Sequence, residues 1–211
     1  MKKKRLVILI SVLVIWIPVI FNLYYWNRLP DKIATHFNSQ MVADGWSPKP
    51  VAVFLLPVIL TAIQLFIIYL MERDPQKNNL QDWITYIVFA IIPVISLGIG
   101  FVVLSTALGA DVDLYKKTLL NLVAGIMLII VGVVLEYVKP NQTVGIRVPW
   151  TLHSPKNWQM THRFGSKVFI VGGIAGLVAG MFSLNLLLIP ILLIVITIPV
   201  IYSYVLHRKG I

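Results

Sequence analysis

The apolar run VFIVGGIAGLVAGMFSLNLLLIPILLIVITIPVIYSYVL, residues 168–206, decides how many times this chain crosses a membrane. At 39 residues it is about twice the length of one spanning helix, because a helix rises about 1.5 Å per residue and the hydrocarbon core is roughly 30 Å thick. The polar residues Ser183 and Asn185, followed by Pro190, indicate a tight turn within the run. It therefore predicts two antiparallel spans, near 167–185 and 188–206.

Four further apolar runs are long enough to cross a bilayer, at residues 6–26, 51–71, 83–108 and 118–138. Only 12% of the residues are charged, against about 25% in soluble domains. The first run is too long for a signal peptide and ends in YYW without a small-residue cleavage site. The sequence thus predicts an all-α integral membrane protein with six transmembrane helices and both termini on the same side.

The positions of the cations predict which side that is. Thirteen of the 18 Lys and Arg residues fall on the side of the termini and five on the other, which places the termini in the cytoplasm by the positive-inside rule. The thirteen are Lys2, Lys3, Lys4, Arg5, Arg73, Lys77, Lys139, Arg147, Lys156, Arg163, Lys167, Arg208 and Lys209, and the five are Arg28, Lys32, Lys49, Lys116 and Lys117. Because these cations lie at the ends of apolar runs, the net charge of +10 does not indicate direct nucleic-acid binding.

Within the spans, small and polar residues give hints of helix packing. Gly172, Gly176 and Gly180 repeat at four-residue spacing, which lets another helix approach closely. We expect this contact within the chain rather than in a dimer, and the oligomeric state stays open. The prolines expected to bend helices are Pro18, Pro57, Pro93 and Pro199. The polar residues at depth are Asn22, Gln64, Asn121 and Glu136.

Glu136 is the one acidic residue within a predicted span, about one turn from its cytoplasmic end. Lys139 or Arg147 is positioned to pair with it there. An ion-coupled transporter usually carries ionisable groups near the middle of the membrane. The sequence therefore disfavours that class and favours an interfacial ion pair.

We divide the chain into an N-terminal two-span region, residues 1–82, and a four-span region, residues 83–211. The first holds an extracellular loop, residues 27–50, whose turn signals predict a compact fold-back. This loop is either a cap on the lipid headgroups or the surface that meets a partner from outside. Its candidate contact residues are His36, Phe37, Asn38, Asp44 and Trp46.

The four-span region holds a polar cytoplasmic segment, residues 139–167, which begins KPNQTVGIRVPW. Ser154 followed by Pro155 predicts an N-cap and the first turn of a short helix that leads into the fifth span. At 100° per residue, Lys156, Arg163 and Lys167 share one stripe, with Trp158 and His162 opposite. The stripe suits anionic lipid in the cytoplasmic leaflet, and it also suits a docked cytoplasmic protein.

Enzymatic chemistry finds little support in the residues. The chain has no cysteine, no HExxH metal motif, no Walker-type phosphate loop and no GxSxG nucleophile elbow. We therefore expect no metal, no cofactor and no catalytic residues. A headgroup-modifying enzyme that uses Glu136, His153 and Arg147 is the remaining enzymatic hypothesis.

The segment PNQTVGIRVPWTLHSPKNWQMTHRFGSKVF resembles the SdpI family of bacterial membrane proteins over about thirty residues. The matching positions are Pro140, Asn141, Gly145, Arg147, Pro149, Trp150, Thr151, Trp158, His162 and Arg163. The outer loop is similar to the small N-terminal domain of unknown function that often accompanies this family, with one departure at Met41, where a glycine is usual. The matches there are Leu29, Pro30, His36, Phe37, Asn38, Asp44, Gly45 and Lys49.

The resemblance implies a bacterial plasma-membrane immunity protein that protects the cell against a secreted peptide toxin. It also implies that the engaged protein holds a cytoplasmic transcriptional repressor at the membrane. Candidate partner-binding residues in the cytoplasmic segment are Asn141, Gly145, Arg147, Pro149, Trp150, Trp158, His162 and Arg163. The alternative is a transporter or a lipid-handling protein, which requires a polar cavity at membrane depth.

Overall fold

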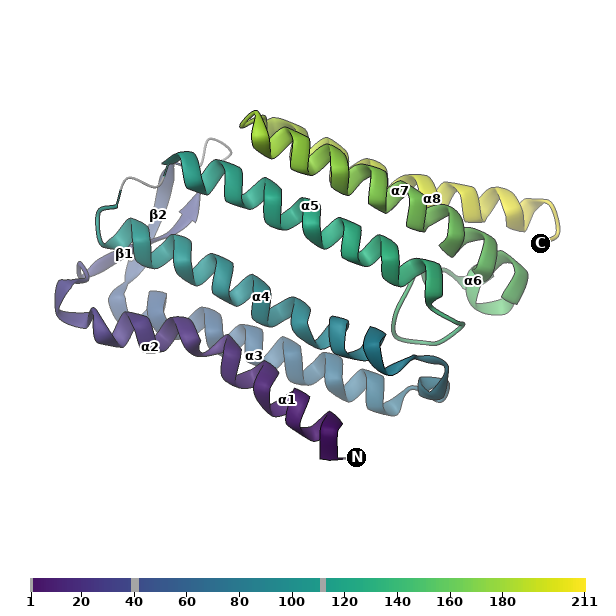
Figure 1. The fold of residues 1–211 in the computed structure, drawn as a ribbon, viewed down its shortest axis with the longest axis horizontal. Helices are drawn as coiled ribbons and strands as arrows, with labels where there is room; N and C mark the ends of the chain where they lie inside the picture. The colour runs from purple at the N-terminus through teal and green to yellow at the C-terminus, as the bar shows by residue number, and fades with distance from the viewer. Residues whose placement is uncertain (1, 39–41, 111–112) are drawn as a thin grey trace. The chain divides into compact units, whose positions relative to one another are not determined.

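The computed structural model describes residues 2–38, 42–110 and 113–211 (Figure 1). Met41, where the outer loop departs from the family pattern, lies outside the described residues. The elements in chain order are α1 (Lys2–Ile15), α2 (Ile17–Tyr24), η1 (Trp26–Arg28), β1 (Lys32–Phe37), β2 (Ala43–Pro48), α3 (Lys49–Arg73), η2 (Lys77–Asn79), α4 (Asp82–Ala107), α5 (Asp113–Tyr137), α6 (Pro149–His153), α7 (Pro155–Met181), η3 (Asn185–Leu187) and α8 (Leu188–Arg208).

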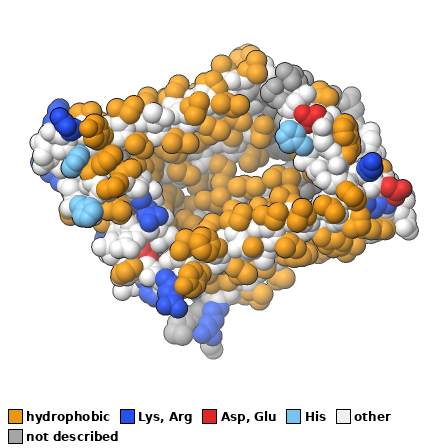
Figure 2. All heavy atoms as spheres, turned by 180° about the vertical axis from the view of Figure 1, so that it is seen from behind, with side chains coloured by type: hydrophobic (Ala, Val, Ile, Leu, Met, Phe, Trp, Pro, Cys, Tyr) orange, Lys and Arg blue, Asp and Glu red, His pale blue; other side chains and the backbone are white. Residues whose placement is uncertain are grey.

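Six helical stretches in the described part of the chain are long and apolar enough to cross a membrane, which confirms the predicted all-α six-span class. Hydrophobic side chains cover these helices, and charged side chains gather toward their ends (Figure 2). The first span, Lys3–Tyr24, is broken at Trp16, just before Pro18. α3, α4 and α8 continue as helix through Pro57, Pro93 and Pro199.

The chain forms two compact units, Met1–Tyr69 with Tyr86–Lys117 and Leu70–Thr85 with Thr118–Ile211. α3 and α4 each contribute residues to both. The division into an N-terminal two-span region, residues 1–82, and a four-span region, residues 83–211, stays a prediction.

In the first unit, the outer loop is a β-hairpin in which β1 pairs antiparallel with β2. Its inner side chain Ile33 joins Val19, Leu29 and Val53 in a buried cluster. The hairpin is thus anchored by apolar contact with α2 and α3. The compact fold-back has the form of two strands that the turn signals alone did not predict.

Polar side chains inside the first unit join its helices to one another. Gln64 of α3 is fully buried, and its Nε2 donates to Ser11 Oγ at 3.0 Å and to the carbonyl of Phe89 at 3.1 Å. Ser96 of α4 donates to the carbonyl of Ile15, at the break in the first span, at 2.8 Å. These groups at membrane depth therefore serve helix packing.

In the second unit, glycines bring α5 and α7 into backbone contact. A Cβ added at Gly125 would lie 2.8 Å from the carbonyl oxygen of Gly173, and one added at Gly132 would lie 2.9 Å from that of Ser166. Gly176 and Gly180 also face α5, as expected for close packing within the chain, whereas Gly172 faces Val195 of α8. α7 then turns through Ser183, which has φ +55°, and η3 into α8.

Candidate functional site

The motif loop, residues 138–154, leaves α5 after Tyr137 and returns to the start of α7. As predicted, Ser154 caps α7, because its Oγ accepts the backbone N–H of Asn157 at 3.2 Å, and Pro155 is the first helical residue. The predicted short helix and the fifth span prove to be one continuous helix, α7. The loop is thus held between two long helices of one unit.

Asn141 folds the first turn of the motif loop. Its side chain is fully buried and makes four hydrogen bonds with the backbone. Nδ2 donates to the carbonyls of Lys139 and Val144, both at 2.9 Å, and Oδ1 accepts the N–H groups of Thr143 at 2.8 Å and Val144 at 2.6 Å. An aspartate in its place would have no donor for the two carbonyls.

Trp158 and His162 form the inner wall against which the loop packs. Their rings stack with centroids 4.0 Å apart, and both side chains are buried. Trp158 Nε1 donates to the carbonyl of Val138 at 3.1 Å. His162 Nε2 accepts the N–H of Ile146 at 2.9 Å, so the proton of the neutral ring lies on Nδ1, which donates to the carbonyl of Trp158.

Gly145 fits against this wall because it lacks a side chain. Its φ of +127° is rarely adopted by other residues, and an added Cβ would collide with His162 Nε2. Trp158 ring carbons would lie 3.2 Å away. This glycine therefore allows the loop to reach the histidine.

Asp74 is the residue of this site that sequence reasoning missed. Its side chain is buried, and Oδ2 accepts Gln142 N–H at 2.8 Å and Thr143 Oγ1–H at 2.7 Å. Oδ1 accepts the N–H of Gln76 at 2.7 Å. Asp74 directly follows α3, so one carboxylate ties the segment after α3 to the motif loop.

The second half of the loop is fixed by Trp150 and Thr151. Trp150 Nε1 donates to Ser203 Oγ at 2.8 Å, and its ring stacks on His207 of α8 with centroids 5.6 Å apart. Buried Thr151 accepts Val148 N–H at 3.1 Å and donates to the carbonyl of Ile146 at 2.8 Å. Pro149 begins α6, where its missing N–H costs no hydrogen bond.

The cations of the segment stay on its surface. Lys156, Arg163 and Lys167 are exposed and Trp158 and His162 buried, as the helical stripe predicts. Glu136 pairs with Arg163, at 3.8 Å, and not with Lys139 or Arg147 as expected. Helix α7 runs back along α5, which brings Arg163 to the acid. Exposed Arg147 has no ion-pair or hydrogen-bond partner within the described ranges.

The five outer-loop candidates lie on the β-hairpin. His36 Nδ1 contacts Asp44 Oδ1 at 2.5 Å across the strands, and both side chains are largely open to solvent. Asn38 Oδ1 accepts the N–H of Val42 at 3.0 Å, which joins the end of β1 to the start of β2. Phe37 is half-buried, whereas Trp46 is 58% exposed. His36, Asp44 and Trp46 are thus accessible to a partner.

The enzymatic hypothesis needs Glu136, His153 and Arg147 in one pocket. Glu136 lines a pocket of about 350 Å³ beside α7, and His153 lines a different one near the end of α8. Arg147 lines neither. Among the described residues there is also no group of three or more metal-ligating side chains. This particular catalytic arrangement is therefore absent from the part of the chain that the structure describes.

Comparison with known proteins confirms the resemblance to the SdpI family. The model of the SdpI/YfhL protein family matches residues 137–203, and that of a domain of unknown function (DUF1648) matches residues 13–61. The chain is 26% identical over 204 residues to a protein of Bacillus subtilis (strain 168) named immunity protein SdpI, with 95% of this chain and 96% of that protein covered. No solved structure matches significantly.

Proposed function

We propose, from the match to the SdpI/YfhL family, that this chain is a plasma-membrane immunity protein without enzymatic activity. It protects the cell against a secreted peptide toxin and holds a cytoplasmic repressor at the membrane. The observation that carries the proposal is the similarity to an immunity protein over 95% of the chain. The ordered surfaces of the hairpin and the motif loop support it, because each offers exposed side chains on a fixed backbone.

The proposed orientation rests on the cation count of thirteen against five. It puts both termini and the motif loop in the cytoplasm and the hairpin outside the cell. A toxin then meets His36, Asp44 and Trp46, and a repressor meets Arg147. Buried Asn141, Trp158 and His162 fix the loop instead of touching the partner.

Immunity is tested by expression in a toxin-sensitive bacterium that lacks a related protein. Cells that make the full chain should survive a dose of secreted toxin that kills cells making an unrelated six-span protein at equal abundance. Survival is measured by plating after exposure. Equal killing in both cultures, across the toxins of bacteria that carry such genes, rules out the immunity role.

Arg147→Ala tests whether the motif loop holds the repressor. Arg147 is exposed and has no partner among the described residues, so its removal should leave folding and insertion unchanged. Loss of a planar, bidentate donor at an interface should weaken binding roughly 30-fold. The measurement is co-sedimentation of the repressor with membranes.

Lys156→Ala is the matched control, since it removes one exposed positive charge from the same segment. Arg147→Lys separates the guanidinium geometry from its charge. Unchanged repressor capture by Arg147→Ala, or an equal loss with Lys156→Ala, contradicts a specific role for Arg147.

A further inference from the structure

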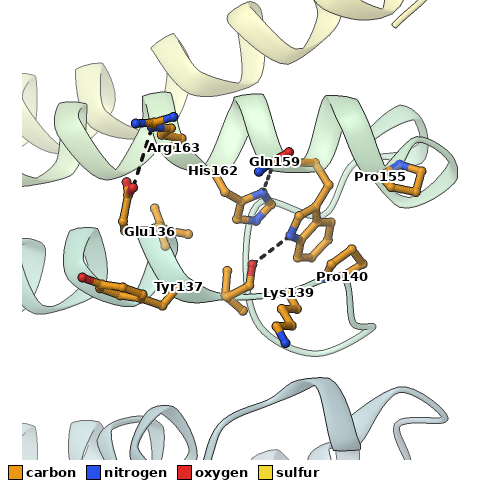
Figure 3. Close-up of a pocket in the computed structure, with 11 residues that line it drawn as sticks. Glu136, Tyr137, Lys139, Pro140, Pro155, Gln159, His162 and Arg163 are labelled. Atoms are coloured by element: carbon orange, nitrogen blue, oxygen red, sulfur yellow. Dashed lines mark hydrogen bonds and ion pairs between the residues drawn. The ribbon is translucent and has the colours of Figure 1, made fainter.

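The pocket between α5 and α7 has an aromatic floor and a charged rim (Figure 3). Its volume of about 350 Å³ lies in the range of small-ligand sites. The floor is formed by Trp158 and His162, and the rim carries Glu136, Lys139, Gln159 and Arg163. The pocket lies within the second unit, where α5 ends and the chain leaves its predicted span.

The floor has no polar atom to offer a ligand. Trp158 Nε1 donates to Val138, and both ring nitrogens of His162 are engaged with Ile146 and Trp158. A small hydrated anion gains little from such a floor, because burying it there removes water without a hydrogen bond in return. Carbon atoms of a ligand, by contrast, gain from contact with the apolar lining that stays accessible, Pro140 and Pro155.

The rim has the opposite character and favours an anion. Lys139, Gln159 and Arg163 are exposed, and in the described part of the chain the rim side chains make a single ion pair with one another, Glu136–Arg163 at 3.8 Å. With side-chain exposures of 37% and 72%, that pair is solvent-screened and weak. A phosphate can engage the Arg163 guanidinium in two parallel hydrogen bonds and approach Lys139.

The charge of the surrounding chain also favours an anionic ligand. Residues 136–167 carry five cations, Lys139, Arg147, Lys156, Arg163 and Lys167, and one acid, Glu136. Of these cations, only Lys139 and Arg163 line the pocket. An anionic glycerophospholipid combines an anionic head with a carbon body at the edge of a bilayer, and it fits both features of the pocket.

We propose that this pocket binds the headgroup of an anionic glycerophospholipid. The phosphate lies between Arg163 and Lys139, and the glycerol carbons contact the accessible apolar lining at Pro140 and Pro155. The inference goes beyond the proposed immunity function and needs neither toxin nor repressor. Its failure therefore leaves that function untouched.

The test is native mass spectrometry of the purified full chain with equimolar phosphatidylglycerol and phosphatidylcholine. The protein should retain phosphatidylglycerol selectively, and Arg163→Gln should weaken that binding about tenfold, the value of one charged hydrogen-bonding partner. Lys139→Gln should also weaken it. Lys156→Gln and Lys167→Gln, which remove equal charges outside the pocket, should change it less than about twofold.

Glu136→Gln should increase lipid binding, a result that misfolding of the variant would not produce. Removing the Glu136 carboxylate releases Arg163 from its ion pair and removes a negative charge that repels the phosphate. Retention of phosphatidylglycerol should therefore rise. The proposal is overturned if phosphatidylcholine is retained equally, or if the control lysines matter as much as Arg163. Displacement of the lipid by millimolar inorganic phosphate would show a bare-phosphate site and overturn it too.

Discussion

Gly125→Ala should destabilise the second unit by about 2 to 3 kcal/mol, because the new methyl group collides with the backbone of α7. The added Cβ would lie 2.8 Å from the carbonyl oxygen of Gly173 and 2.9 Å from the backbone nitrogen of Leu177. Neither neighbour can rotate away, since both are helix backbone. Unfolding in mixed detergent micelles measures the free energy, and a separation of α5 from α7 is the physical event expected.

Gly98→Ala is the matched control on α4. There an added Cβ has no heavy atom within 4 Å, and alanine is a better helix former than glycine by up to about 1 kcal/mol. This variant should be as stable as the wild type or slightly more stable. Equal stability of Gly125→Ala and Gly98→Ala would mean that the two backbones do not touch.

Asp74→Ala should release the motif loop, since one substitution removes the acceptor of three hydrogen bonds. The N–H of Gln142, the hydroxyl of Thr143 and the N–H of Gln76 all lose their partner. Leaving such donors without an acceptor costs about 1 to 3 kcal/mol each, less where water can reach them. Hydrogen exchange of the backbone amides from Gln142 to Ile146 should therefore accelerate while the spans stay protected.

Two variants check the assignment of Asp74. Asp74→Asn keeps one carbonyl oxygen and should give an intermediate exchange rate. Asp82→Ala removes an exposed carboxylate from the same unit, at the start of α4, and should leave the loop protected. If Asp74→Ala leaves the amide of Gln142 as protected as in the wild type, the carboxylate does not hold the loop.

The six spans could be read from the sequence because hydrocarbon imposes one length and one composition on every crossing helix. The cap at Ser154 and the buried side of α7 were predictable for a similar reason, since both follow from local spacing. α7 begins earlier than the hydropathy indicates, because its polar residues Asn157, Thr161 and Ser166 are buried inside the unit and not exposed to water.

The hairpin and Asp74 could not be predicted in the same way. β2 reads ADGWSP, with Asp, Gly and Pro that strands disfavour, and two consecutive residues of β1, Ile33 and Ala34, are buried. Alternation therefore gives no clear strand signal. Asp74 contacts Gln142 and Thr143, which lie 68 and 69 positions further along the chain. No local pattern in the sequence indicates such a long-range contact.

In the motif loop, the side chains that fix the backbone are different from those exposed on the surface. Asn141, Thr151, Trp158 and His162 are buried, and their polar atoms make hydrogen bonds within the fold, while Arg147 is exposed at the surface. A relative can keep this set intact and exchange its exposed residues for others. The motif is therefore a signature of a loop architecture, and two proteins that share it can differ in the exposed side chains of that loop.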